Sequence, residues 1–336
     1  MSGTDVLVLS SADVERLLGM GECIEAMASA FMALGRGNGV QPLRSVTRVP
    51  DGSGSLYVMP AFLPAADPNS EGTLSVKLIS LFIGNTAVGL ESHQGVIVLF
   101  GARQGEVRAV MEASRVTAIR TAAVSALATR LLALPDAADL AILGAGVQAR
   151  SHIEAMLAVR NVRRVRIWSR TPGNARRLAE EARARHSIDV SATETAEAAV
   201  RGADLICATT ASPSPVLKSE WVSLGAHINA VGSSTPGARE LDTETMARAC
   251  VFVDSREAAL AEAGDVLIPM AEGAFGRGHI RGELGELVAG RCVGRVTGSD
   301  ITVFKSLGLA VEDAAAARLL YDRAGQAGNV GATARL

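Results

Sequence analysis

The stretch from Asp139 to Ala149 reads Asp-Leu-Ala-Ile-Leu-Gly-Ala-Gly-Val-Gln-Ala, a short apolar run that ends in the pattern Gly144-x-Gly146-x-x-Ala149. This pattern predicts a buried strand, a tight turn and the start of a helix. Gly144 permits the turn, Gly146 lets the main chain approach a pyrophosphate group, and the small Ala149 lets the helix pack close to the strand. Phosphate groups would then bind the free N–H groups at the helix N-terminus.

Glycine-rich turns also occur where no ligand binds, so the neighbouring sequence decides the interpretation. Residues 147–160 have the periodicity of a helix, and Val165-Arg-Ile-Trp168 reads as a second strand at the spacing of a β-α-β unit. The stretch is therefore interpreted as the phosphate-binding turn of a dinucleotide-binding domain.

The end of that second strand indicates which dinucleotide binds. An NAD site usually offers Asp or Glu to the ribose 2′-hydroxyl at this point, whereas this chain reads Ser169-Arg170-Thr171. A guanidinium and two hydroxyls suit a 2′-phosphate, which arginine binds through paired hydrogen bonds. We therefore expect NADP(H) rather than NAD(H). The alternative is that Arg170 is one more surface arginine, since Arg176 and Arg177 follow closely.

Length and composition narrow the class of protein. A chain of 336 residues is long enough for two domains. Its formal net charge of −2 gives no electrostatic footprint for nucleic acid or for an anionic membrane, and neither is expected as a partner. The four cysteines are far apart, and neither a metal site nor a disulfide framework is expected. Residues 1–5 lack the basic and apolar regions of a signal peptide, and a cytoplasmic location is expected.

The glycine turn comes late in the chain, so another folded region precedes it. In that region we expect a helix over 12–35, strands over 44–49, 55–59, 73–82 and 95–100, and a helix over 112–134. After the turn, strands are expected at 165–168, 205–209, 227–231 and 251–254 with helical segments between them, an alternation typical of a parallel sheet. A last helix over 310–324 is expected to return to the first region and make it discontinuous.

Three cations of the first region stand in apolar surroundings: Arg44, Lys77 and Arg120. A single lysine or arginine in a strand or helix usually lies on the solvent side, with its aliphatic stem along the surface. If the three converged on one pocket, a bound carboxylate would be the anionic partner that desolvated cations require. The spacing alone leaves both interpretations open.

Eight segments carry a more specific pattern. They are Val116-Thr-Ala-Ile-Arg-Thr-Ala-Ala-Val-Ser-Ala, Gly144-Ala-Gly-Val-Gln-Ala, His227-Ile-Asn-Ala-Val-Gly-Ser-Ser, Glu240-Leu-Asp, Val253-Asp-Ser, Ala263-Gly-Asp, Glu283-Leu-Gly-Glu and Val303-Phe-Lys-Ser-Leu-Gly-Leu-Ala-Val-Glu-Asp. In this order, over nearly the whole chain, they resemble the ornithine cyclodeaminase/μ-crystallin family. The resemblance implies an α/β fold in which a Rossmann dinucleotide-binding domain (128–304) is inserted in a discontinuous α+β substrate-binding and dimerisation domain (1–127 and 305–336). It also implies a homodimer.

The resemblance assigns expected roles to individual residues. Arg44, Lys77 and Arg120 match the family's substrate-carboxylate and active-site cations. Arg120 is also expected near the cofactor phosphates, because Thr121 beside it matches a cofactor contact. The positions that match the family's cofactor site are Ser92, Arg120, Thr121, Gly144, Gly146, Val147, Gln148, Ser169, Arg170, Thr171, Thr209, Val231 and Ser306.

One departure distinguishes the branches of the family. Ornithine cyclodeaminases and the related alanine dehydrogenases carry Asp in the motif Ala-Val-Gly-x-Asp, where this chain has Ser234. A hydroxyl is a poor general base for a substrate ammonium, although it can donate a hydrogen bond or orient a water. In this respect the chain is similar to the μ-crystallin branch, whose members reduce cyclic ketimines with NADPH.

The sequence therefore predicts NADP(H)-dependent reduction of a small α-imino acid, such as 1-pyrroline-2-carboxylate or 1-piperideine-2-carboxylate, with an open-chain imine as an alternative substrate. Lys77 is expected to give the imine nitrogen its proton or to hold a water that does, while Arg44 and Arg120 bind the carboxylate. The alternative activity is cyclodeamination or amino-acid dehydrogenation with a substitute base. The alternative class is a non-catalytic protein that binds NADPH and a small acid. His93 is interpreted as a local hydrogen-bonding residue.

Overall fold

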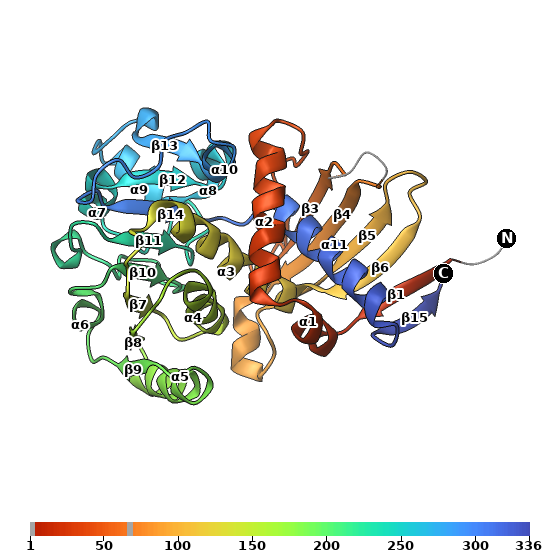
Figure 1. The fold of residues 1–336 in the computed structure, drawn as a ribbon, viewed down its shortest axis with the longest axis horizontal. Helices are drawn as coiled ribbons and strands as arrows, with labels where there is room; N and C mark the ends of the chain where they lie inside the picture. The colour runs from red at the N-terminus through yellow and green to blue at the C-terminus, as the bar shows by residue number, and fades with distance from the viewer. Residues whose placement is uncertain (1–3, 66–69) are drawn as a thin grey trace. The chain divides into compact units, whose positions relative to one another are not determined.

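A computed structural model of the chain describes residues 4–65 and 70–336. By its internal contacts the chain divides into two compact units, one formed by Met1–Arg120 with Leu309–Leu336 and the other by Thr121–Gly308. The first unit is therefore built from both ends of the chain, and the second is inserted between them (Figure 1). The sequence predicts that the inserted domain spans residues 128–304. The second unit spans Thr121–Gly308, so each predicted limit lies a few residues from the limit in the structure. No signal peptide is expected in residues 1–5. Of these, residues 1–3 lie outside the described residues.

The first unit contains a mixed sheet. In spatial order its strands are β15 (Ala332–Arg335), β1 (Asp5–Leu9), β6 (Val107–Glu112), β5 (His93–Gly101), β4 (Thr73–Leu81), β3 (Ser55–Leu63) and β2 (Ser45–Arg48). Strands β1 and β6 are parallel, and the other neighbours are antiparallel. The first and last strands of the chain thus pair with each other at one edge of this sheet.

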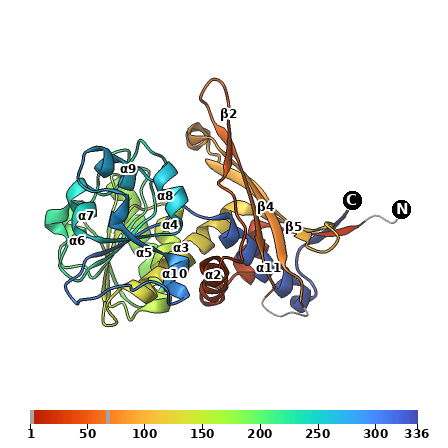
Figure 2. The same ribbon diagram turned by 90° about the horizontal axis from the view of Figure 1, so that it is seen from above.

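Helices from both ends of the chain gather on one face of this sheet. They are α1 (Ser11–Leu17), α2 (Met20–Gly35) and α11 (Ala310–Ala327), and a short 3-10 helix, η1 (Ile83–Val88), connects β4 to β5. Helix α11 packs on β3, β4 and β5, and both α1 and α2 contact α11 (Figures 1 and 2). The C-terminal segment therefore completes the core of the first unit.

The single helix expected over Ala12–Gly35 is wrong, because α1 and α2 are separate helices that meet at 87°. Helix α1 ends at Leu17, because the next residue, Leu18, has a ψ of 80° that is not helical, and α2 begins after Gly19. Glycine has a low helix propensity, which favours a break at this point. Across the described ranges no single helix is long and apolar enough to cross a membrane; only the bent pair of α1 and α2 satisfies that test, by length and composition.

Strand alternation gives the sheet of the first unit two apolar faces. The inner face, which α11 covers, is buried and includes Met59 and Ile97. The outer face is only half-buried. One row across four strands of this outer face consists of Pro60, Val76, Val98 and Val110.

The second unit contains a parallel sheet. In spatial order its strands are β9 (Asp189–Ala192), β8 (Arg164–Trp168), β7 (Asp139–Leu143), β10 (Leu205–Ala208), β11 (His227–Ala230), β14 (Thr302–Lys305), β12 (Cys250–Val253) and β13 (Ile280–Glu283). The connecting helices are α4 (Val147–Val159), α5 (Pro172–Arg185), α6 (Ala196–Val200), η2 (Ser219–Trp221), α7 (Thr243–Arg248), α8 (Arg256–Glu262), α9 (Gly264–Ala271), η3 (Arg277–His279) and α10 (Leu284–Val288). Helix α3 (Ala113–Leu132) begins in the first unit and ends in the second. The central strands are buried throughout, as expected of a parallel sheet covered on both faces.

The predicted fold class, a Rossmann domain inserted in a discontinuous α+β domain, is confirmed. Six short strands were not expected from the sequence. They are β1, β6, β9, β13, β14 and β15, of which β9, β13 and β15 lie at the ends of the two sheets. Short strands at a sheet edge have one exposed side and few apolar residues, so their sequences carry little periodic signal.

Candidate active site

The cofactor positions expected in the second unit lie at one edge of its sheet. Gly144 follows β7, Ser169 follows β8, Thr209 follows β10, Val231 follows β11 and Ser306 follows β14. Because these strands are parallel and adjacent in the order β8, β7, β10, β11 and β14, the five residues form one row along the carboxyl edge. Chain order reverses between β7 and β10, which is the position at which open α/β sheets bind their ligands.

Two glycines shape the turn after β7. Gly144 has a φ of 116°, which residues with a side chain rarely adopt, and a Cβ there would lie 2.7 Å from the carbonyl oxygen of Thr209. Gly146 has extended backbone angles, with φ at −90° and ψ at −164°, and a Cβ there would meet nothing within 4 Å. As the N-cap of α4, Gly146 supplies no side-chain acceptor to the first amides of the helix. These amides are therefore available to an anionic group, as the glycine pattern predicts.

Two buried polar atoms beside this row lack a hydrogen-bond partner among the described residues: Oε1 of Gln148 and Oγ of Ser306. Gln148 is in the first turn of α4, and Ser306 is 1% exposed at the end of β14. A buried polar atom without a protein partner usually bonds a ligand or a water. The open space at Gly146 and these two atoms together fit a bound dinucleotide.

The connection from β8 to α5 carries Ser169, Arg170 and Thr171. The Oγ of Ser169 accepts a hydrogen bond from the backbone N–H of Thr171 at 3.3 Å, and Arg170 is exposed. Thr171 is the N-cap of α5, and Pro172 occupies the first helical position. Arg170 thus stands next to a helix N-terminus at the end of the second strand, the position at which Rossmann domains bind the ribose 2′-substituent.

The loop after β11, which carries Val231 and Ser234, is held by a buried carboxylate to which the sequence analysis gave no role. The two oxygens of Glu240 accept hydrogen bonds from the backbone N–H of Thr210 at 2.5 Å and of Gly232 at 2.6 Å. Burial raises the pKa of Glu240 to about 7. Ser234 itself is exposed.

A buried ion pair supports the same loop from the other side. The Nζ of Lys305 lies 3.0 Å from Oδ2 of Asp265 and donates to the carbonyl oxygen of Ser233 at 2.5 Å. The Oδ1 of Asp265 accepts the backbone N–H of Glu240 at 2.8 Å and of Leu241 at 3.0 Å. The motifs Glu240-Leu-Asp and Ala263-Gly-Asp were visible in the sequence, but the contact between them links segments that are far apart in the chain.

In the first unit, two of the three expected cations are buried and share one carboxylate. Lys77 in β4 is 2% exposed, and Arg120 in α3 is 3% exposed. The Nζ of Lys77 lies 2.7 Å from Oδ2 of Asp313, and the Nε of Arg120 donates to Oδ1 of the same residue at 3.0 Å. The Nη1 of Arg120 also donates to Glu312 at 2.5 Å. Asp313 therefore bridges the two cations.

The protein itself supplies the anionic partner that the sequence analysis assigned to a bound carboxylate. Glu312 and Asp313 lie in the first turn of α11, and both are buried. A substrate carboxylate that binds Lys77 or Arg120 therefore shares these cations with α11. The motif that ends at Asp313 was visible, but its spacing does not indicate that the first turn of α11 lies against β4.

The surroundings of Lys77 favour loss of its proton near neutral pH. Burial is the largest effect and lowers the pKa of the ammonium to about 8, while the negative charge of Asp313 opposes this and Arg120 lowers the pKa further. A group with a pKa close to the working pH can act as a general acid. Lys77 therefore has the protonation behaviour that a proton donor requires.

Arg44 is half-buried and directly precedes β2. Ser45 pairs with Val58, and Met59 pairs with Lys77. Continuing this register by one residue puts Arg44 level with Met59, in the same row across the sheet as Lys77. At the usual spacing of strands, the Cα atoms of Arg44 and Lys77 are then about 10 Å apart.

Ser92 and Thr121 are the remaining expected cofactor contacts. The Oγ of Ser92, in the first unit, lies 3.1 Å from Nδ1 of His93. Thr121, in the second unit, is buried on α3. The pKa of His93 is lowered, chiefly by burial and then by the positive charge of Lys77. A contact of Ser92 or Thr121 with a cofactor stays a prediction.

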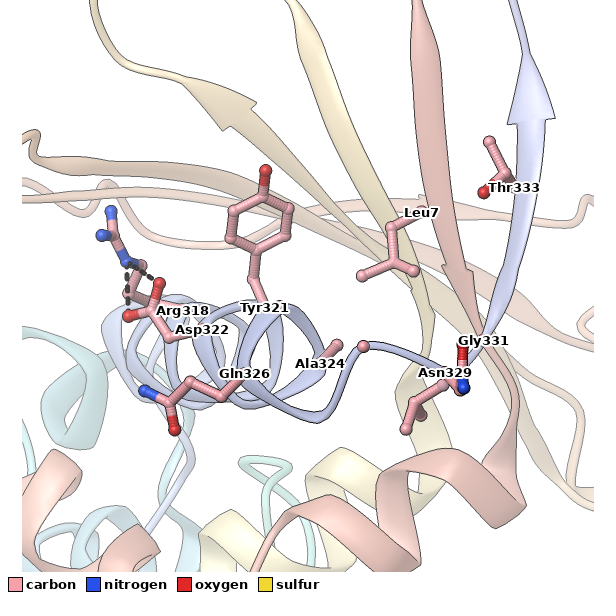
Figure 3. A pocket seen from close by; sticks show the side chains of 12 residues that line it. Leu7, Arg318, Tyr321, Asp322, Ala324, Gln326, Asn329, Gly331 and Thr333 are labelled. Carbon is pink, nitrogen blue, oxygen red and sulfur yellow. Dashed lines mark hydrogen bonds and ion pairs between the residues drawn. The ribbon is translucent and has the colours of Figure 1, made fainter.

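A separate surface depression lies in the first unit at the C-terminal half of α11. Figure 3 shows Arg318, Tyr321 and Asp322 along the helix, with Leu7 and Thr333 on the neighbouring strands. The Nε of Arg318 donates to the carboxylate of Asp322 at 2.9 and 3.0 Å. Among the described residues that line this depression, none belongs to the expected site.

The parallel sheet, its glycine turn and the row of residues at the carboxyl edge define a dinucleotide-binding α/β protein. The chain belongs to the ornithine cyclodeaminase/mu-crystallin family, whose model matches residues 4–328. This confirms the resemblance noted in the sequence.

Three similar proteins span nearly the whole chain. The ketimine reductase mu-crystallin of Mus musculus is 44% identical over 299 residues, which are 89% of this chain and 90% of the relative. The structure of Thermococcus litoralis Delta(1)-pyrroline-2-carboxylate reductase in complex with NADH and L-proline has a TM-score of 0.93 and 40% identity, and the match covers 97% of this chain and 99% of that one. An archaeal alanine dehydrogenase dimer with bound NAD has a TM-score of 0.91 and 31% identity, covering 98% and 99%.

Proposed function

We propose that this chain is an NADP(H)-dependent imine reductase that acts on a small α-imino acid. A cyclic ketimine such as 1-pyrroline-2-carboxylate or 1-piperideine-2-carboxylate is the first choice of substrate, and an acyclic imino acid is the second. The similarity to a ketimine reductase and to a pyrroline-2-carboxylate reductase supports this reaction class. An alanine dehydrogenase has nearly the same fold, so a residue of the site must decide between imine reduction and amine oxidation.

Ser234 is the observation that carries the choice of imine reduction. Cyclodeamination requires proton transfers during amine oxidation and again during ring closure, whereas reduction of a preformed C=N bond requires only one proton at the nitrogen. Ser234 places an exposed hydroxyl after β11 where the cyclodeaminase motif has a carboxylate. The nearby carboxylates of Glu240 and Asp265 accept backbone hydrogen bonds within the loop, so they are committed to its structure. Lys77, in contrast, is suited to supply a proton.

The row at the carboxyl edge of the parallel sheet would hold the cofactor, which supplies the hydride when bound. Gly144 and Gly146 would let its pyrophosphate reach the first amides of α4. Arg170 would bind the 2′-phosphate, with Ser169 and Thr171 beside it. The positions proposed for the remaining contacts are Ser92, Arg120, Thr121, Val147, Gln148, Thr209, Val231 and Ser306.

Three cations of the first unit would act on the substrate. Arg44 and Arg120 would bind the carboxylate of the imino acid, and Asp313 and Glu312 hold Arg120 in place for this contact. When the imine carbon gains hydride, the nitrogen gains an electron pair and needs one proton. The Nζ of Lys77 would donate that proton directly or through a water, and it would then be reprotonated from solvent.

The preference for NADP(H) rests on the sequence Ser169-Arg170-Thr171. Two of the similar structures contain NADH or NAD, so the preference proposed here rests on residues of this chain and not on the similar structures. In this chain no carboxylate follows β8 directly, and an exposed arginine does. A guanidinium favours the dianionic 2′-phosphate over a hydroxyl.

We also propose a cytoplasmic homodimer. The row of Pro60, Val76, Val98 and Val110 gives the first unit a half-buried apolar face of the kind that a second copy covers in a stable dimer. A relative of nearly the same fold is a dimer. The four cysteines are free, as they remain in a reducing compartment.

A panel of imines assayed by NADPH consumption tests this proposal. Cyclic ketimines should be reduced readily, and L-ornithine should release no ammonia with NADP⁺ or NAD⁺. Rapid conversion of L-ornithine to proline would refute the assignment and show that another base acts. Tight NADPH binding without turnover of any imine or amino acid would instead support a binding protein.

A further inference from the structure

The chain uses lysine at only three positions among its 33 lysine and arginine residues. Lys218 is exposed and lies over the ring of Trp221. Lys77 and Lys305 are buried, and each pairs with an aspartate. Since arginine carries the positive charge almost everywhere else, lysine at these two buried sites calls for a specific explanation.

Lysine differs from arginine in one property that matters inside a protein. Arginine stays charged at any pH that proteins meet, whereas a buried lysine can lose its proton. Lys305 has a structural role, because its Nζ donates to the carbonyl of Ser233 and pairs with Asp265. The described contacts of Lys77 include no backbone carbonyl; its ammonium meets the carboxylate of Asp313, which also holds Arg120.

We propose that Asp313 is a positioning residue of the active site, which fixes the Lys77 ammonium in place and keeps it charged until it transfers its proton. This inference rests on the proposed function, in which Lys77 is the proton donor. Asp313 comes from the first turn of α11, Lys77 from the middle of β4 and Arg120 from α3. One oxygen of the carboxylate faces each cation, so rotation of the side chain is restricted by both contacts.

The charges around Lys77 explain why one carboxylate decides its protonation state. From α11 it meets Asp313 and Glu312, both of which favour its charged form. From α3 it meets Arg120, which disfavours the charged form. His93 on β5 also interacts with Lys77. Two cations and two carboxylates thus balance, and removing the charge of Asp313 leaves an excess positive charge that Lys77 relieves by losing its proton.

Asp313→Asn tests the inference through the pH dependence of kcat/KM and of the NMR signal of the Lys77 side chain. A general acid must be protonated, so kcat/KM should fall as pH rises through the pKa of Lys77, which is about 8 in the wild type. The amide cannot stabilise the ammonium, so in the variant this fall should move to lower pH by about one to three units. Titration of the free protein labelled with ¹³C at the lysine Cε should give the same shift, and three lysines make the assignment simple.

Asp322→Asn is the matched control, because Asp322 lies on the same helix and is half-exposed in a pair with Arg318. This variant should leave both pH profiles unchanged. Asp313→Glu keeps the negative charge but displaces it by one methylene. The midpoint of the Lys77 titration should therefore stay nearer to the wild-type value than it does in Asp313→Asn, whereas kcat should fall. If Asp313→Asn does not fold, the wild type and Asp313→Glu still carry the test.

A Lys77 titration midpoint that is the same in the wild type and in Asp313→Asn would overturn the inference. If Asp313→Asn does not fold, the inference is overturned when the wild type and Asp313→Glu have the same Lys77 titration midpoint and the same kcat. A wild type that reduces no imine, with the midpoint still lowered in the variant, would refute the proposed function and leave the control of Lys77 by Asp313 standing.

Discussion

Replacement of Gly146 by alanine separates cofactor binding from folding. The backbone at Gly146 is extended, and a Cβ there would meet no atom within 4 Å. The protein without cofactor should therefore accept the methyl group. Because alanine restricts the unfolded chain, the free energy of unfolding should stay the same or rise by about 0.4–1 kcal/mol.

The same methyl group would occupy the space into which a pyrophosphate must come to reach the first amides of α4. A hydrogen bond from a backbone N–H to a charged phosphate contributes about 1.5–3 kcal/mol. Loss of one such bond in Gly146→Ala should weaken NADPH binding by about ten- to a hundredfold.

Gly144→Ala is the contrasting variant. Its φ of 116° and a Cβ only 2.7 Å from the carbonyl oxygen of Thr209 predict strain in the protein itself. Strained backbone of this kind costs about 1–3 kcal/mol, so this variant should unfold at a lower temperature without any ligand.

Thermal unfolding without cofactor and titration with NADPH by fluorescence measure the two effects. Gly146→Ala should retain its unfolding temperature and lose affinity, whereas Gly144→Ala should lose stability. Wild-type affinity for NADPH in a folded Gly146→Ala protein would refute the placement of the phosphates at this turn.

Three further variants test the remaining parts of the site. Arg170→Ala should weaken NADPH binding by about tenfold or more and leave NADH binding unchanged, because only NADPH carries the 2′-phosphate; equal losses for both cofactors would contradict this. Arg44→Ala should lower kcat/KM for the imino acid more than about tenfold while the Kd for NADPH stays the same, and full activity would assign Arg44 a structural role. Val98→Glu, at the centre of the outer face, should yield monomers in sedimentation experiments, whereas Leu224→Glu, at an exposed position of the second unit, should not; a dimer that survives Val98→Glu would place the interface elsewhere.

The cofactor-binding half of the fold could be predicted because its determinants are local. Gly144, Gly146 and the residues after β8 lie within one β-α-β unit, where a strand, a turn and a helix follow each other in sequence. Strand ends and glycine turns leave a pattern in short windows. The expected row along the sheet edge follows from this pattern and from the parallel order of the strands.

The partners of the cations could not be predicted, because they depend on contacts between distant segments. Arg120 and Asp313 are 193 residues apart in the chain. The spacing of residues in β4 suggests that Lys77 faces one side of a strand, but it does not show which helix covers that side. The same reason explains why Glu240 and Asp265 were seen as motifs without a role. The break between α1 and α2 was missed because only Leu18 and Gly19 separate two helices that follow each other in the chain.

The construction of the first unit from both ends of the chain determines when during synthesis its charged cluster can form. The ribosome releases residues 121–308 before residues 309–336, so the parallel sheet can be completed while α11 is still absent. Until α11 arrives, Lys77 and Arg120 lack the carboxylates of Asp313 and Glu312, and their burial is unfavourable. A nascent chain that stops before α11 therefore has the strands of the parallel sheet but lacks the carboxylate that holds the Lys77 ammonium.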